Sequence, residues 1–240
     1  KDPATYYDIN VGGSLSVLKA MLLADVGKIV FSSTCAVYGI PATSPISETE
    51  TPNPINPYGY TKLTVERMLS DMADAHGIKF AALRYFNAAG ADRKGRIGER
   101  HDPEPHLIPN VIRAAQGKQD AVQIFGQDYP TPDGTAVRDF IHVDDLAEFH
   151  LRAMAHVDRS NSNITANLGT GTGYSVRQIV DAVSEIAGTT TPAVDQPRRP
   201  GDPPALVASP ERAQELLVYS ARHSDLPTIL RTAWDWHERE

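Results

Sequence analysis

A tyrosine and a lysine stand four residues apart in this 240-residue sequence, in the run NPYGYTK. Tyr58 and Lys62 fall at the start of an expected helix, so their side chains project from one face about one turn apart. A phenol is a weak base at neutral pH, and a nearby cation stabilises the phenolate and lowers the pKa of the phenol. Such a pair is suited to moving a proton to and from a hydroxyl group. Taken alone, it is also typical of an ordinary helix surface.

The elements around this pair predict an α/β fold. Lys28–Ser33 is a short apolar strand that precedes the pair, and Phe80–Tyr85 is the next strand along the chain. Helices are expected over Thr5–Leu23 and Tyr58–His76 from the spacing of their apolar residues. Alternating helices and short strands are typical of a parallel sheet with right-handed crossovers. Thr34, directly after the first strand, then lies at the carboxyl edge of the sheet, where the active sites of such sheets collect.

Beyond Asn87 the pattern loosens and predicts a smaller second α/β domain. We expect residues 1–87 to form a doubly wound domain with a return segment at about 140–170, and residues 88–240 to form mainly the second domain. The elements expected after Asn87 are helices at Leu107–Gln116, Val143–His156, Val176–Ala187 and Leu226–Arg239, and strands at Val122–Phe125 and Ala166–Leu168.

The composition limits the classes of protein that this sequence can represent. With 41% hydrophobic and 22% charged residues it is typical of a globular protein, and a net charge of −7 argues against a nucleic-acid partner. The sequence contains no apolar run of about 20 residues and no secretory signal, so we expect no membrane and a cytoplasmic location. The single cysteine, Cys35, excludes an internal disulfide, and the eight histidines lack the spacing of zinc ligands, so we expect no metal.

Three runs, FSSTCAVYG, NPYGYTK and LRYFNAAG, carry a resemblance in their order and spacing. Together they resemble the extended short-chain dehydrogenases/reductases, and specifically the UDP-glucose 4-epimerase family. The resemblance implies the C-terminal part of a Rossmann-type sheet with a smaller UDP-sugar-binding domain, NAD as cofactor, and a homodimer. It also implies an isomerase of galactose metabolism, which interconverts UDP-glucose and UDP-galactose through a 4-keto intermediate.

The resemblance assigns a role to each residue of the first constellation. In the family the tyrosine is the acid/base, the lysine binds the nicotinamide ribose, and a serine or threonine hydrogen-bonds the reacting hydroxyl group. These roles fall to Tyr58, Lys62 and Thr34, which would contact NAD together with Phe86 and Asn10. The neighbouring Cys35 is expected to be a buried small hydrophobe rather than a nucleophile.

The resemblance continues through PHLIPNV, QIFGQDYPTPDGTAVRDFIHVDDLA and RRPGD. An arginine is a forked cation suited to a diphosphate, although each one taken singly is typical of a solvated surface charge. The family pattern assigns the phosphates to Arg138 and Arg199 and the uridine ribose to Asp202. The other expected substrate contacts are Asn87 with the diphosphate or sugar, His106 and Leu107 in the wall of the site, Gln123, Ile124 and Phe125 around the uracil, and Leu206 beside the sugar substituent. His106 stands where relatives often have asparagine, which leaves both plain and N-acetylated hexoses open.

Two alternatives remain. Nucleotide-sugar 4,6-dehydratases share the tyrosine and lysine but have an Asp-Glu pair after the threonine, where this sequence has Cys35 and Ala36. The other alternative is a truncated, non-catalytic relative that binds a UDP-sugar. We keep it because the family normally begins with a strand, a Gly-x-x-Gly-x-x-Gly turn and a helix that holds the NAD pyrophosphate. That turn does not occur in these residues, and we expect the sequence to begin about four strands into the family's sheet.

Overall fold

The computed structural model describes residues 2–239, which form two compact units. Unit 1 contains residues 2–85, 148–168 and 209–219, and unit 2 contains residues 86–147, 169–208 and 220–239. The chain therefore enters unit 1 three times. The last of these segments, Ser209–Tyr219, lies outside the return segment that the sequence suggested.

Unit 1 is built on a three-stranded parallel sheet. Its strands are β1 (Lys28–Thr34), β2 (Lys79–Tyr85) and β6 (Ile164–Leu168), in the order β1-β2-β6. The middle strand β2 is buried along nearly its whole length, as expected for a parallel strand covered on both faces. Thr34 pairs with Tyr85 at the carboxyl edge of the sheet, where the sequence predicted it.

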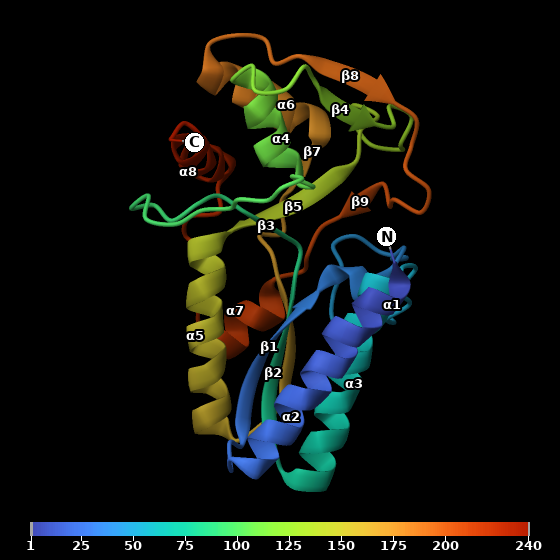
Figure 1. Ribbon diagram of the computed structural model, residues 1–240, viewed down its shortest axis with the longest axis vertical. Helices are drawn as coiled ribbons and strands as arrows, with labels where there is room; N and C mark the ends of the chain where they lie inside the picture. The colour runs from blue at the N-terminus through green and yellow to red at the C-terminus, as the bar shows by residue number, and fades with distance from the viewer. Residues whose placement is uncertain (1, 240) are drawn as a thin grey trace. The chain divides into compact units, whose positions relative to one another are not determined.

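Helices cover both faces of this sheet (Figure 1). On one face lie α2 (Gly13–Leu23) and α3 (Pro57–His76), and on the other lie α5 (Val143–Ser160) and α7 (Glu211–Leu217). The predicted doubly wound α/β class is therefore confirmed. Where one helix was expected before β1, the structure has three helical segments, with α1 (Pro3–Tyr6) and the π-helix η1 (Tyr7–Gly12) preceding α2.

The helix α3 has clear start and stop signals. The side chain of Asn56 accepts a hydrogen bond from the Gly59 amide at 2.9 Å, and Pro57 occupies the first turn, where no amide hydrogen is needed. Gly77 ends the helix with a left-handed φ of 74°. Between these ends, Val65 and Leu69 are buried against the sheet in a core shared with α2.

Unit 2 is organised around β5 (Val137–His142). This strand pairs in parallel with β3 (Asn87–Ala89) and β9 (Ala205–Leu206), and antiparallel with β7 (Gly173–Ser175). A separate parallel pair is formed by β4 (Val122–Phe125) and β8 (Ala193–Gln196). Of these strands the sequence predicted β4 and, in the run DFIHVDDLA, the strand β5 that leads directly into a helix.

Three helices form the core of unit 2, namely α4 (Leu107–Ala115), α6 (Val176–Ala187) and α8 (Leu226–His237). Ile112, Val183 and Ile229, one from each helix, are fully buried in the same apolar cluster. Within residues 2–239, no helix combines the length and the apolar character needed to cross a bilayer.

Candidate functional site

The carboxyl edge of β1 and the first turns of α3 bring the catalytic candidates of unit 1 together. The Thr34 side chain lies close enough to Tyr58 to lower the pKa of its phenol, and Thr34 Oγ1 accepts from the Ala36 amide at 3.1 Å. Lys62 Nζ lies 5.8 Å from the centroid of the Tyr58 ring and donates to the Ser32 carbonyl at 3.0 Å. A phenol, a hydroxyl and an ammonium group therefore converge at one strand end, as proton transfer to a hydroxyl substrate requires.

The pKa values of this group correct one expectation. Burial raises the pKa of the Tyr58 phenol, and the nearby Thr34 side chain offsets this only in part. Burial also lowers the pKa of Lys62. The net shift of the Tyr58 pKa is therefore opposite in direction to the one expected from the spacing of Tyr58 and Lys62, because burial disfavours the phenolate.

Asn10 is tied to the same constellation. Its amide Nδ2 donates to Thr61 Oγ1 at 2.9 Å, and Thr61 Oγ1 donates to the Tyr58 carbonyl at 2.8 Å. Asn10 lies in the π-helix η1, a local geometry that is frequent at functional sites. Asn10 and Lys62 line a cavity of about 400 Å³ whose other walls are largely apolar, including Ile29, Phe31 and Val65. This cavity, with a cation and an amide in its wall, suits the flat ring and ribose of a nicotinamide nucleotide.

The anion-binding candidates lie in unit 2. Arg138 Nη2 contacts Asp202 Oδ1 at 2.5 Å, and Leu206 pairs with Arg138 in the β5–β9 register. Arg199 lies over the ring of Phe125, with 3.9 Å between its guanidinium carbon and the ring centroid. The structure thus brings Arg138, Asp202 and Leu206 into one group and Arg199 and Phe125 into another.

The remaining candidates of unit 2 differ in burial. Gln123 is exposed, whereas Ile124 is 1% exposed in the apolar core, so any contact of Ile124 with a base would use its backbone. Leu107, at the start of α4, packs against the same core. Phe86 is buried, and Asn87 Nδ2 donates to the Asp139 carbonyl at 2.9 Å.

His106 belongs to a polar group that the sequence did not predict. His106 Nδ1 lies 2.6 Å from Glu99 Oε1 and 2.8 Å from Glu104 Oε1, and His101 Nε2 lies 3.1 Å from Glu99 Oε1. In the part of the chain that the structure describes, Glu99, His101 and His106 are the group whose spacing suits a metal ion. Each of these contacts is also an ordinary ion pair, so the expectation of a metal-free protein stays a prediction.

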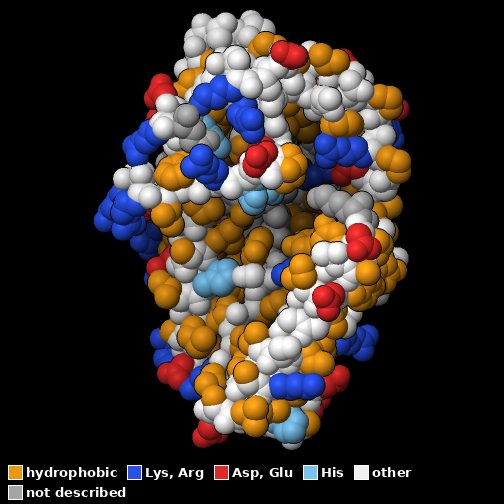
Figure 2. All heavy atoms as spheres, in the orientation of Figure 1, with side chains coloured by type: hydrophobic (Ala, Val, Ile, Leu, Met, Phe, Trp, Pro, Cys, Tyr) orange, Lys and Arg blue, Asp and Glu red, His pale blue; other side chains and the backbone are white. Residues whose placement is uncertain are grey.

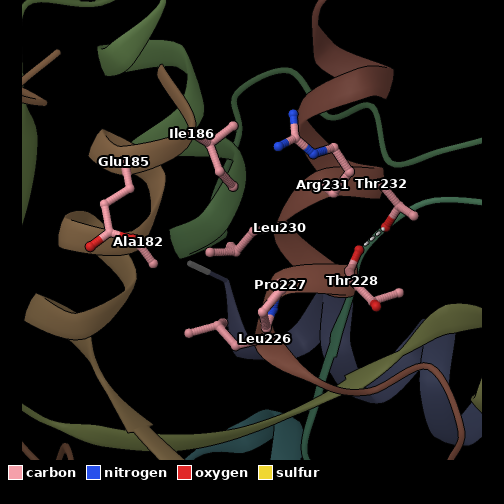
Figure 3. A pocket seen from close by; sticks show the side chains of 9 residues that line it. All are labelled: Ala182, Glu185, Ile186, Leu226, Pro227, Thr228, Leu230, Arg231 and Thr232. Carbon is pink, nitrogen blue, oxygen red and sulfur yellow. Dashed lines mark hydrogen bonds between the residues drawn. The ribbon is translucent and has the colours of Figure 1, made fainter. Parts of the chain in front are cut away.

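A second cavity, of about 450 Å³, lies between α6 and α8 (Figure 3). Its walls include Ile186, Leu226 and Leu230, and the Thr232 hydroxyl donates to the Thr228 carbonyl at its edge. None of the predicted site residues lines this cavity.

Sequence reasoning missed a buried pair next to the catalytic candidates. Glu66, two turns beyond Tyr58 on α3, forms an ion pair with Arg84 of β2. The four-residue spacing of Tyr58, Lys62 and Glu66 was a visible signal, because residues at this spacing share one helix face. The partner was not visible, because it depends on which strand lies under the helix.

Comparison with known proteins agrees with the resemblance. The model of the NAD dependent epimerase/dehydratase family matches residues 1–169. The UDP-glucose 4-epimerase of Halalkalibacterium halodurans is 48% identical over 99% of this chain and 71% of its own length, and that of Lacticaseibacillus casei is 46% identical over 99% and 72%.

Solved structures give the same result. The UDP-glucose 4-epimerase from Brucella ovis in complex with NAD has a TM-score of 0.95 at 51% identity, over 98% of this chain and 72% of that one. The enzyme from Bifidobacterium longum in complex with NAD+ and UDP has a TM-score of 0.93 at 39% identity, over 99% of this chain and 71% of that one. The fold, the residues at the strand end and these likenesses lead to one conclusion: the chain belongs to the NAD dependent epimerase/dehydratase family.

Proposed function

We propose that this chain carries the acid/base and nucleotide-sugar-binding residues of a UDP-glucose 4-epimerase. The observation that supports this most directly is that Lys62 Nζ lies 5.8 Å from the centroid of the Tyr58 ring on α3, beside the end of β1, where Thr34 lies. The relatives above are named for this reaction. At the place where a 4,6-dehydratase would have an Asp-Glu pair, this chain has a buried Cys35 and Ala36, which supply no acid or base for elimination.

The residues of unit 1 perform the proton transfer in this proposal. Tyr58 Oη takes the proton of the sugar 4-hydroxyl group as a 4-keto sugar forms, and it returns a proton when the keto group is reduced on its other face. The Thr34 hydroxyl orients the reacting oxygen, and Lys62 holds a ribose through the donors that it does not use on the Ser32 carbonyl.

The fit of a nicotinamide cofactor rests on the cavity that Asn10 and Lys62 line. When bound, oxidised NAD supplies the hydride acceptor for C4 and a positive charge that favours the Tyr58 phenolate. We also assign Thr34 to this cofactor site. Phe86, which lies in unit 2, stays an expected cofactor contact, and we assign no residue to the pyrophosphate.

The residues of unit 2 hold the nucleotide in this proposal. Arg138 and Arg199 bind the diphosphate, because a guanidinium group pairs with phosphate oxygens in a bidentate way. Asp202 accepts from the uridine ribose hydroxyls. Asn87, His106, Leu107, Gln123, Ile124, Phe125 and Leu206 complete the expected substrate contacts. The sugar is a plain hexose or its N-acetylated form, and Leu206 is the residue expected to bear on this choice.

Substitution of the proposed base tests the function. We expect Tyr58→Phe in the NAD-loaded enzyme to abolish conversion of UDP-galactose to UDP-glucose, because the reacting hydroxyl loses its proton acceptor. Calorimetry should find UDP affinity nearly unchanged. The matched control is Tyr60→Phe on the same helix, where the tyrosine is exposed and turnover should be retained. Turnover by Tyr58→Phe near that of the unaltered enzyme would overturn the assignment.

We also infer a cytoplasmic homodimer that meets through the first helices and α3. Hydrophobic side chains lie exposed along the first helices (Figure 2). Among them Tyr7 is 46%, Leu22 37% and Leu23 90% exposed, which supports this interface. Light scattering should give twice the mass of one chain, and Leu23→Glu should give that of one chain. The control Leu151→Glu, at an exposed position of α5, should stay dimeric. A mass of one chain for the unaltered protein would reject the dimer. The cytoplasmic location is tested separately by cell fractionation.

A further inference from the structure

Glu66 is a buried carboxylate on the same face of α3 as the proposed acid/base. Tyr58, Lys62 and Glu66 follow one another at four-residue intervals, so they form a single stripe along the helix. Glu66 is only 8% exposed. Burying an ionised carboxylate is unfavourable unless it is paired and hydrogen-bonded. The partners of Glu66 therefore indicate what this charge does.

The carboxylate of Glu66 binds both neighbouring strands at one level of the sheet. Arg84 of β2 donates from Nε to Oε1 at 2.9 Å and from Nη2 to Oε2 at 2.5 Å, which is a bidentate pair of fixed direction. Ser33 Oγ of β1 donates to Oε1 at 2.5 Å. Ser33 and Arg84 are partners in the strand register, and Ser33 directly precedes Thr34. The carboxylate thus fixes α3 to the sheet one residue from the proposed catalytic threonine.

The other side of Arg84 reaches the segment that follows Thr34. Arg84 Nη1 donates to Tyr38 Oη at 2.9 Å, and Tyr38 Oη donates to Asn167 Oδ1 of β6 at 2.8 Å. Tyr38 ends the short 3-10 helix η2 (Cys35–Tyr38), which begins directly after Thr34. One network therefore holds the residue before Thr34, the end of the turn after it, and the helix that carries Tyr58.

The pKa shifts of Arg84 and Tyr38 favour the forms that these hydrogen bonds use. Burial disfavours the Arg84 guanidinium, but the hydrogen bonds and charge of Glu66 outweigh it and raise the pKa of Arg84 above its usual range. Burial raises the pKa of Tyr38, which remains a neutral phenol.

Stabilisation of the fold does not by itself explain why the protein contains the buried Glu66–Arg84 ion pair. Replacing a buried ion pair by well-packed apolar residues is often neutral or stabilising, whereas the pair itself fixes direction. Direction matters here, because a displacement of about 1 Å at a reacting centre can lower the rate about 100-fold.

We propose that Glu66 and Arg84 are positioning residues that hold Tyr58 and Lys62 against Thr34 for proton transfer. This inference rests on the proposed function of Tyr58. Neither residue touches the reacting atoms in this proposal. Both act through α3 and the strand ends to which they bind.

The test compares Glu66→Gln with the unaltered enzyme, each loaded with NAD. An amide of the same shape places an NH2 group against the donors of Arg84, so α3 must shift. We expect kcat to fall about 100-fold, with KM for UDP-galactose within about twofold. The alkaline limb of the kcat/KM profile should also move, because the environment of Tyr58 changes. Rates are divided by the concentration of UDP-binding sites measured by calorimetry, so that unfolded protein does not lower the measured kcat.

Two further variants keep the test decisive. Ser33→Ala removes only the link between β1 and Glu66, and it should lower kcat about tenfold even if Glu66→Gln fails to fold. Asp71→Asn, at an exposed carboxylate on α3, is the matched control and should leave kcat and the pH profile unchanged.

The outcomes separate the two proposals. If folded Ser33→Ala and any folded Glu66→Gln keep kcat within twofold and the same pH profile, the pair is merely structural and the inference is overturned. If the unaltered NAD-loaded enzyme does not interconvert UDP-galactose and UDP-glucose, the proposed function itself is rejected.

Discussion

His106 is held by two carboxylates in the loop before α4. The hydrogen bond with Glu99 raises the pKa of His106, and partial burial opposes this effect. Glu99 shows the matching direction: burial raises its pKa, but the hydrogen bond and charge of His106 bring it below its usual range. The pKa shifts of His106 and Glu99 therefore both indicate that the charged pair is favoured in the folded protein.

This pair predicts a pH dependence of stability. Because the pKa of His106 is raised on folding, its stabilising effect is fully present below the unfolded value of about 6.5 and is lost as pH rises through the folded value. We expect the free energy of unfolding to decrease over this interval, and to decrease less in His106→Asn. Urea titrations at several pH values measure this, with Glu99→Gln as the second arm. Equal slopes in all three proteins would contradict the prediction.

At the residue scale, the sequence predicts functional side chains whose partners lie near them in the chain. Helix spacing put Tyr58 and Lys62 on one face and Thr34 at a strand end, and the resemblance of the three sequence runs then gave these residues their expected roles. Arg84 was not recognisable, since an arginine inside a strand gains its meaning only from the buried carboxylate above it. The pKa of Tyr58 was predicted in the wrong direction because burial cannot be read from spacing.

At the element scale, α3 lies so close to η2 that only glycine fits between them. A Cβ on Gly59 would lie 2.5 Å from the Ala36 carbonyl oxygen, which is backbone and cannot turn aside. The first turn of α3, with Tyr58 in it, is thus placed by direct backbone contact with the turn that follows Thr34.

This contact predicts a strong effect of one methyl group. Gly59→Ala should push the first turn of α3 away, with a loss of stability of about 1–3 kcal/mol and a 10- to 100-fold fall in kcat, about the range expected for a misplaced base. Chemical denaturation and the epimerase assay measure the two effects. The control is Gly13→Ala in α2, where a Cβ meets nothing within 4 Å. That change should stabilise the protein by about 0.5–1 kcal/mol. Normal turnover by Gly59→Ala would show that the contact does not place Tyr58.

The strands of unit 1 were predictable and most of those of unit 2 were not. Lys28–Thr34 and Lys79–Tyr85 are apolar runs bounded by loops, as buried parallel strands usually are. The strand Val137–His142 is mixed in polarity, because it contains Arg138 and the fully buried Asp139. Asp139 accepts from the amides of Thr170, Gly171 and Ala208, so its burial depends on loops far along the chain.

At the scale of the whole molecule, the protein is acidic while its proposed ligand is a dianion. With a net charge of −7, the chain gains affinity for a diphosphate only from placed arginines. Arg138 and Arg199 lie in unit 2, whereas Tyr58 and Lys62 lie in unit 1. Binding and proton transfer are therefore expected to be separable by substitution.

We predict that Arg138→Gln weakens UDP binding about 10- to 100-fold, the loss expected for a charge-assisted hydrogen bond. Calorimetry with UDP and the NAD-loaded enzyme measures it. Arg231→Gln, at an exposed position of α8, should bind UDP normally. Unchanged affinity in Arg138→Gln would remove this residue from the phosphate site.

The three-part composition of unit 1 has a consequence for synthesis on the ribosome. Its third strand ends at Leu168 and its last helix at Leu217, and the whole of β3–β5 is translated between the second and third strands. Unit 1 therefore cannot close its sheet until residue 168 has left the exit tunnel, and it cannot cover β6 until residue 217 has followed. During this interval the nascent β2 presents an unpaired apolar edge, which makes early chaperone contact at Phe80–Leu83 an expected feature of its biogenesis.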